Sequence, residues 1–145
     1  MFQTIILAGN LGRDPEMRYT PTGQAVTSFS VATNRQWTNN NGELVKETVW
    51  FRVSVWGKMA EVCNQYLKKG SKVLVEGRLT ADPNTGGPRI WTGQDGQPRA
   101  SFEVSAQTVR FLSSRGEIEG ATGVSTVAVE ETDFGDILPD DNIPF

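Results

Sequence analysis

Two kinds of side chain alternate between residues 45 and 56. The odd positions are valine or phenylalanine except for Glu47. The even positions carry Lys46, Thr48, Trp50, Arg52, Ser54 and Trp56. Because successive side chains of a strand point to opposite faces, one face would pack inward and the other would present two indoles and two cations. Indoles stack on bases, each worth roughly 1–3 kcal/mol, and cations neutralise phosphates, so this pattern favours a nucleic-acid-binding strand.

The same pattern has an alternative interpretation. A strand buried on both faces would place its tryptophans in a core or in a subunit interface. Tryptophan exposed to solvent is uncommon unless it contacts a ligand or a partner. Both interpretations remain open for Trp50 and Trp56 at this point.

Charge is distributed unevenly along the 145 residues. All 14 Lys and Arg residues lie at or before Arg115, against 9 acids, so this segment carries a net charge of +5. The last 30 residues contain 8 acids and no base, a net charge of −8. A basic body joined to an acidic tail is typical of a nucleic-acid-binding protein with an interaction tail.

Composition argues against an enzyme. The chain has no histidine, which removes histidine-based acid–base chemistry, histidine metal sites and Ser-His triads. A metal-dependent nuclease would need converging carboxylates, and only Asp14 and Glu16 are close in sequence among the acids of the body. We expect no catalytic residue, no metal and no cofactor. A module for structured RNA, or an accessory factor for replication restart, remains a second alternative.

Periodicity predicts three strands, one helix and two further strands. The strands are expected at residues 4–7, 25–35, 45–56, 72–79 and 99–104, the last extending as far as 112. Gly9, Gly12 and Pro15 indicate a turn after the first strand, and residues 39–42 indicate a hairpin turn. Apolar residues at helical spacing predict a helix over 58–69, ending at Gly70. Residues 80–98 are rich in glycine and proline and predict a long mobile hairpin.

This order of elements is that of the OB-fold, a five-stranded Greek-key barrel that binds oligonucleotides across its second and third strands. The fold class is therefore all-β with one helix, with the barrel at residues 1–112. Residues 113–139 are expected to be a disordered linker, because small residues and acids bury too little apolar area to fold. Residues 140–145 form an acidic tip.

Three long segments carry a resemblance to a known family: residues 7–19 (LAGNLGRDPEMRY), 50–62 (WFRVSVWGKMAEV) and 66–73 (YLKKGSKV). With the tip at 140–145 (DDNIPF), they make the chain resemble the bacterial single-stranded DNA-binding proteins. The resemblance implies a homotetramer that coats single-stranded DNA and recruits replication, recombination and repair enzymes.

The resemblance also implies roles for particular residues. Base-stacking aromatics match Trp37, Trp50, Trp56 and Trp91. Phosphate-contacting cations match Arg52, Lys58, Lys68, Lys69 and Arg89, and Lys46 joins them from its place on the cationic strand face. The partner-binding tip matches Asp140, Asp141, Ile143, Pro144 and Phe145.

Several of these residues also have a plainer interpretation. Lys68 and Lys69 could be a solvated helix end that interacts with the helix dipole. Trp37 is expected on the rising arm of the hairpin that turns at residues 39–42, and Trp91 in the hairpin of residues 80–98. Both are polar settings, where there is little to pack against. Cys63 lies on the apolar stripe of the helix and is expected in the core. The tip could be solubilising charge. With no apolar run near the ~20 residues that span a bilayer, we expect a soluble, cytoplasmic protein.

Overall fold

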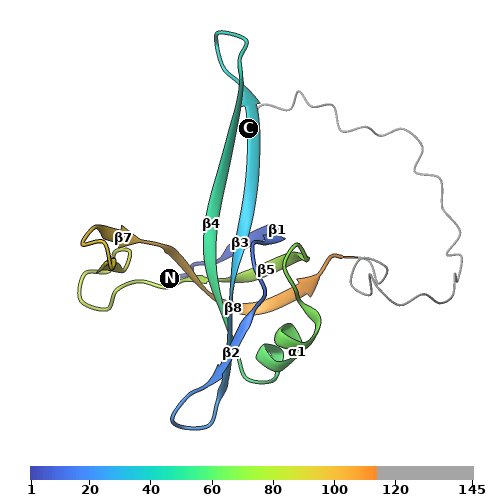
Figure 1. Cartoon of the computed structure of the whole chain (residues 1–145), viewed down its shortest axis with the longest axis vertical. Helices are drawn as coiled ribbons and strands as arrows, with labels where there is room; N and C mark the ends of the chain where they lie inside the picture. Colours follow the sequence, from blue (N-terminus) through green and yellow to red (C-terminus); the bar gives the residue numbers. More distant parts are fainter. Residues whose placement is uncertain (114–145) are drawn as a thin grey trace, which may run out of the picture.

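The computed structural model describes residues 1–113 (Figure 1). In that range the elements are β1 (Ile5–Leu11), β2 (Glu16–Tyr19), β3 (Ala25–Thr38), β4 (Leu44–Trp56), α1 (Lys58–Tyr66), β5 (Lys72–Leu79), β6 (Ile90–Thr92), β7 (Pro98–Ala100) and β8 (Phe102–Phe111). The expected linker beyond residue 113 and the acidic tip lie outside the described residues.

Five strands close a barrel. The order of hydrogen-bonded strands is β1, β5, β8, β4, β3, and β3 pairs back with β1 at Leu11 and Val31. The β4–β8 pair is parallel, whereas the other pairs of the barrel are antiparallel. This mostly stranded barrel with one helix confirms the predicted OB-fold.

Alternating valines fill the barrel. Val31, Val53, Val73 and Val75 have no exposed surface, because the inward face of each strand meets the opposite wall. Helix α1 packs against β2, β3 and β4 and covers one end. It buries Ala60 and Cys63 completely, which confirms the core position expected for Cys63. The hydroxyl of the buried Thr27 donates to the carbonyl of Ala60 at 2.6 Å and fixes the helix on β3.

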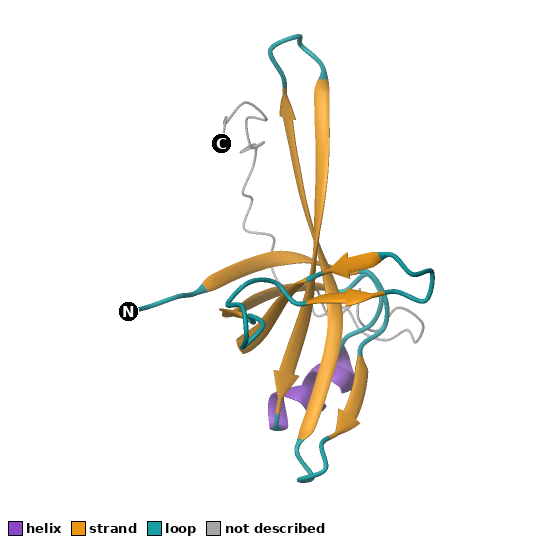
Figure 2. Cartoon of the chain, turned by 90° about the vertical axis from the view of Figure 1, so that its left-hand side faces the viewer, coloured by secondary structure: helices purple, strands orange, loops and turns teal. Residues whose placement is uncertain are grey.

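Strands β3 and β4 extend well beyond the barrel (Figures 1 and 2). Strand β1 pairs with β3 only at Asn10–Ala32 and Leu11–Val31, and β8 pairs with β4 only over residues 51–54. Residues 33–38 and 44–50 therefore form a two-stranded ribbon, here called the arm. Its turn is stabilised by the Asn39 side chain, which accepts from the N–H groups of Asn41 and Glu43. The long hairpin expected here is confirmed.

The first strand is longer than the sequence indicated. Gly9 was expected in a turn, but β1 continues through it to Leu11. A Cβ at Gly9 would lie 2.2 Å from the carbonyl oxygen of Ala32, so this glycine lets β1 and β3 approach where the barrel closes. The prediction of a turn at Gly9 was wrong because close backbone approach and a turn both call for glycine.

Strand β2 was not expected. Its four residues are too few for their alternation to stand out in the sequence, yet Glu16–Tyr19 pairs with residues 25–28 of β3. The pairing depends on an open edge of β3, which tertiary structure supplies. The last predicted strand also differs, because Arg99 belongs to β7 and β8 begins at Phe102.

The helix is shorter than predicted. It ends at Tyr66, and Leu67 already has extended backbone angles, although its N–H still donates to Cys63 at 3.0 Å. Gly70, with φ of 87°, makes the following turn rather than the helix stop. In residues 80–98, β6 pairs with β7, so a hairpin is present there. Its mobility remains a prediction.

Candidate nucleic-acid interface

Strand β4 follows the predicted alternation. Trp50 is 51% exposed and Trp56 43% exposed, and Lys46 and Arg52 are exposed with them. Val53 and Val55 on the other face are buried. Neither tryptophan is therefore in the core of this chain, and the alternative of a strand buried on both faces is wrong within it.

The neighbouring strand leaves the two indoles accessible. The β3–β4 register places Ala32 beside Trp50, Ser30 beside Arg52 and Val26 beside Trp56. We call this surface, with the exposed side chains of residues 46–56, the outer face. Small partners such as Ala32 and Ser30 cannot cover an indole or a guanidinium. Stacking surfaces and positive charges therefore alternate along β4, as a single strand of nucleic acid requires.

Gly12 supports Trp50 from below. A Cβ at Gly12 would lie 2.4 Å from Cζ3 and 2.6 Å from Cη2 of Trp50, so the indole rests directly on this glycine. The Gly12 N–H donates to the carbonyl of Ser30 at 3.1 Å, which holds the two segments together. The sequence marked Gly12 only as a turn residue, because its contact with Trp50 depends on strands distant in sequence.

A lysine-rich hollow borders the outer face. Asn10 pairs with Ala32, so the two share a row with Trp50, and the Asn10 amide donates to the carbonyl of Gly70 at 3.0 Å. The hollow measures about 300 Å³ and is lined by Asn10, Lys68, Lys69, Gly70, Ser71, Lys72 and Ser113. The fold thus places Lys68 and Lys69 beside Asn10, in the same part of the molecule as the row that contains Trp50. It adds Lys72, which sequence reasoning did not single out.

The helix-dipole interpretation of these lysines was wrong. Helix α1 ends before them and has no basic residue in its last turn. The Lys69 N–H instead donates to the carboxylate of Asp14 at 2.8 Å, which fixes the turn. Lys58, by contrast, is the first residue of α1, where a cation opposes the helix dipole. Helix stability therefore does not explain Lys58, which follows Trp56 closely in the chain.

Trp37 lies on the opposite face of the arm. It pairs with Val45, whereas Gln36 pairs with Lys46 on the outer face. Trp37 lies on β3, the rising arm of the hairpin, as expected, and it is partly buried, with the Arg35 guanidinium carbon 4.6 Å from the ring centroid. The arm therefore separates Trp37, which the resemblance had indicated, from Lys46, which the alternation along the strand had indicated.

Trp91 and Arg89 lie on or beside the β6–β7 hairpin. Trp91 is 41% exposed on β6, opposite Arg99, and thus lies in the hairpin that was expected to carry it. Arg99 forms an ion pair with Asp95 at 2.8 Å. The backbone N–H of Gln97 and the Arg99 guanidinium lower the pKa of the Asp95 carboxyl. Arg89 shares a hollow of about 430 Å³ with Asp82 and Glu103, so two carboxylates line the same hollow as its guanidinium.

The described residues hold stacking and cationic groups rather than reactive ones. In residues 1–113 no three His, Cys, Asp or Glu side chains converge as a metal site would require. Burial raises the pKa of the Cys63 thiol to about 11, so little thiolate forms at neutral pH. Within residues 1–113, α1 is the one α-helix, and it is too short and too polar to cross a bilayer.

A closed five-stranded barrel with an aromatic and cationic outer face defines an OB-fold protein of the oligonucleotide-binding type. The model of the Single-strand binding protein family matches residues 2–112, which is the whole barrel. The chain belongs to this family. Its members are non-catalytic DNA-binding proteins, which agrees with the expectation that the chain is not an enzyme.

Curated relatives carry the same family name. The single-stranded DNA-binding protein of Neisseria meningitidis serogroup A (strain Z2491) is 42% identical over 116 residues, which are 80% of this chain and 63% of the relative. That of Wolinella succinogenes is 42% identical over 120 residues, which are 83% of this chain and 70% of the relative. The chain thus spans about two thirds of the length of these relatives.

Solved structures show the same fold. One is the Plasmodium falciparum SSB in complex with single-stranded DNA, with a TM-score of 0.65 and 29% identity over 78% of this chain and 97% of the other. Another is a deletion variant of the single-stranded DNA-binding protein from Thermus aquaticus. Its TM-score is 0.61 and its identity 32%, over 78% of this chain and 51% of the other.

Proposed function

We propose that this protein binds single-stranded DNA with little sequence preference. The observation that carries the proposal is the outer face of β4, where exposed Trp50 and Trp56 flank Arg52. Indoles stack on any base, and a guanidinium contacts any phosphate, so neither group selects a sequence. Family membership and the DNA complex of the Plasmodium falciparum relative support the same ligand.

Tryptophan fluorescence tests the stacking. Poly(dT) should quench it, and Trp50→Ala or Trp56→Ala should each weaken binding by roughly 1–3 kcal/mol. Trp56→Phe is the matched control, because it keeps an aromatic surface and should retain most of the affinity. Loss of folding without a separate loss of binding would contradict the proposal.

The cations are tested by salt. For single strands, log affinity should fall with log salt at about 0.7 per phosphate neutralised. Arg52→Ala and Lys58→Ala should each lower that slope. Arg110→Ala is the matched control, because it removes the same charge from the wall of the barrel formed by β8, β5 and β1. Arg110 pairs with Leu74 in that wall, so its loss should leave the slope nearly unchanged. An affinity independent of salt would contradict the electrostatic contribution.

Binding competition distinguishes the remaining alternatives. Single-stranded DNA, duplex DNA and RNA of equal length should compete for the same face, with single-stranded DNA preferred. A preference for structured RNA would favour the RNA-module alternative. Cleavage of single-stranded DNA in the presence of magnesium would favour a nuclease and contradict a purely binding function.

The wider role follows from the resemblance and from the acidic tail. We infer action in DNA replication, recombination and repair in the cytoplasm, as a homotetramer. A barrel of about 112 residues gains stability when assembly buries further apolar area. Ile6 and Phe102 are exposed apolar residues on the barrel strands that such an assembly could cover. Mass measurement in solution, with and without oligo(dT), tests the tetramer.

The tail is proposed to have two effects. Its acids compete weakly with DNA for the basic body, and its tip recruits partner enzymes through the residues matched by the resemblance. Removing residues 138–145 should tighten DNA binding at low salt, with little effect at high salt. Phe145→Ala should abolish partner capture yet leave the competition intact, because the acids remain. Identical partner sets from bacterial lysate for intact and Phe145→Ala protein would show that the tip only supplies charge.

A further inference from the structure

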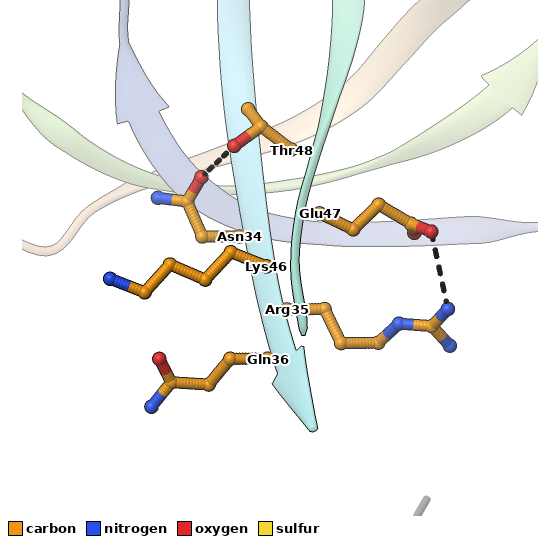
Figure 3. A pocket seen from close by; sticks show the side chains of 6 residues that line it. All are labelled: Asn34, Arg35, Gln36, Lys46, Glu47 and Thr48. Atoms are coloured by element: carbon orange, nitrogen blue, oxygen red, sulfur yellow. Dashed lines mark hydrogen bonds and ion pairs between the residues drawn. The ribbon is translucent and has the colours of Figure 1, made fainter. Parts of the chain in front are cut away.

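Arg35 lies on the face of the arm that points away from Trp50, where it contacts two other side chains. Its Nη2 lies 3.4 Å from Oε2 of Glu47, its direct partner in the β3–β4 register. Its guanidinium also lies over the ring of Trp37. The Arg35 guanidinium therefore contacts the Glu47 carboxylate and the Trp37 indole at the same time. Figure 3 shows Arg35 and Glu47 on one side of the ribbon, with Asn34, Gln36 and Lys46 on the other.

The contact with Glu47 is weak. The two side chains are 58% and 43% exposed, so water screens their attraction. Their separation of 3.4 Å exceeds the 2.7–2.9 Å or so of a well-formed charged hydrogen bond. Phosphate is a stronger partner for guanidinium, because it accepts in a bidentate geometry and its neutralisation releases counterions. Phosphate can therefore displace the carboxylate.

The arm is also narrow enough for one DNA strand to reach both faces. Beyond Ala32 and Phe51 it is only two strands wide, and neighbouring strands lie about 5 Å apart. Lys46 and Trp50 line one side, and Arg35 and Trp37 line the other. A hollow of about 410 Å³ lies at this level, lined by residues 34–36 and 46–48. A nucleic-acid strand that leaves Trp50 can pass over the ribbon edge to Trp37.

We propose that Arg35 is a further DNA contact and that Glu47 pairs with its guanidinium until DNA binds. In the free protein Glu47 neutralises the guanidinium over Trp37. When single-stranded DNA reaches this face, the guanidinium exchanges the carboxylate for a phosphate while remaining stacked on the indole. The inference rests on the proposed function, because it assumes that single-stranded DNA is the ligand. Glu47 then sets the affinity of one face without touching DNA itself.

The test compares two acids of the same arm in the full-length protein. Glu47→Gln frees Arg35, whereas Glu43→Gln removes the same charge from the turn, where the carboxylate accepts from the Asn39 side chain. Glu47→Gln should raise oligo(dT) affinity about two- to five-fold at low salt relative to Glu43→Gln, the range expected for an exposed ion pair. Equal gains in the two variants would overturn the proposal.

Arg35 supplies the second measurement. Arg35→Ala should lower the slope of log affinity against log salt by about 0.7, one phosphate for a single strand. In the Arg35→Ala background the extra gain from Glu47→Gln should vanish, because no guanidinium remains to be freed. A wild-type slope for Arg35→Ala would overturn the proposal, and so would a change of mass in solution without a change in slope, which would make this face a subunit contact.

Trp50→Ala separates this inference from the proposed function. If Trp50→Ala weakens binding and Arg35→Ala does not, only the role of Arg35 fails. If oligo(dT) does not bind the protein at all, the proposed function fails with it. Thermal melting of each variant excludes loss of folding as the cause, and no loss is expected because Arg35, Glu43 and Glu47 are not in the core.

Discussion

The part of β3 and β4 inside the barrel and the part that forms the arm share one alternating pattern but differ in burial. Val53 and Val55 are 0% and 2% exposed in the barrel, whereas Val45 and Val49 on the same face of the arm are only partly buried. The barrel segments have neighbours on both edges, β1 and β8, and a helix at one end. The arm has none of these.

This difference teaches that alternation assigns residues to faces, while burial depends on what covers each face. In the barrel one face is core, so only the outer face can contact a ligand. In the arm both faces are accessible, so both can carry contacts. Trp37 and Arg35 illustrate the second case, since their positions on β3 correspond to the core face of the barrel.

The largest expected effect comes from one substitution made in both regions. Val53→Thr buries a hydroxyl in a fully apolar setting and should lower the free energy of unfolding by about 1–3 kcal/mol. Val45→Thr makes the same change in the arm and should stay within about 0.5 kcal/mol, because water reaches the hydroxyl. Urea denaturation of both variants measures the difference. Equal losses would show that the arm is packed as tightly as the barrel.

Gly9 and Gly12 allow the barrel and the outer face to be compared by the same substitution. A Cβ at Gly9 would meet the backbone oxygen of Ala32, which cannot move without opening the barrel, so Gly9→Ala should destabilise the fold. A Cβ at Gly12 would meet only the exposed ring of Trp50, which can turn aside. Gly12→Ala should keep its stability but lose roughly 1 kcal/mol of DNA affinity, the low end of one stacking contact.

Measurements of stability and of oligo(dT) affinity on both glycine variants decide this. The prediction fails if Gly12→Ala unfolds as readily as Gly9→Ala. It also fails if Gly12→Ala binds DNA as tightly as the unmodified protein, because the support of Trp50 by Gly12 would then have no consequence for the ligand.

The smallest effect concerns Cys63 at the covered end of the barrel. Its pKa is about 11 in the folded protein against 9.0 for an unperturbed thiol, since burial disfavours the thiolate. The stability that this shift contributes is complete below pH 9 and is lost as the pH rises toward 11. Iodoacetamide at pH 8 should leave Cys63 unmodified in the native protein and alkylate it in urea. Thr38→Cys, at an exposed position of the arm, is the control and should be alkylated both in the native protein and in urea. Rapid alkylation of Cys63 in the native protein would contradict its burial.

Much of the outer face could be predicted from local sequence. The period of two between residues 45 and 56 was enough to assign Trp50, Arg52 and Trp56 to one face and Val53 to the core, because side-chain direction along a strand is a local property. The order of strands and helix likewise indicated the OB-fold. The charge asymmetry between body and tail is a property of composition alone.

Other features were decided by tertiary structure. Strand β2 forms because β3 offers it an open edge, and α1 ends at Tyr66, before the lysines that were predicted to close it. Gly9 and Gly12 look alike in sequence, yet one admits a neighbouring strand and the other supports an indole.

The sequence by itself determined which side chains share a face, the chemistry that this face offers, and the basic body with its acidic tail. Only the tertiary structure decided which faces are covered, that Lys72 joins Lys68 and Lys69 beside Asn10, and that Trp37 and Lys46 lie on opposite sides of the arm. The physical reason is that alternation acts between adjacent residues, whereas burial, register and close approach depend on strands far apart in the chain.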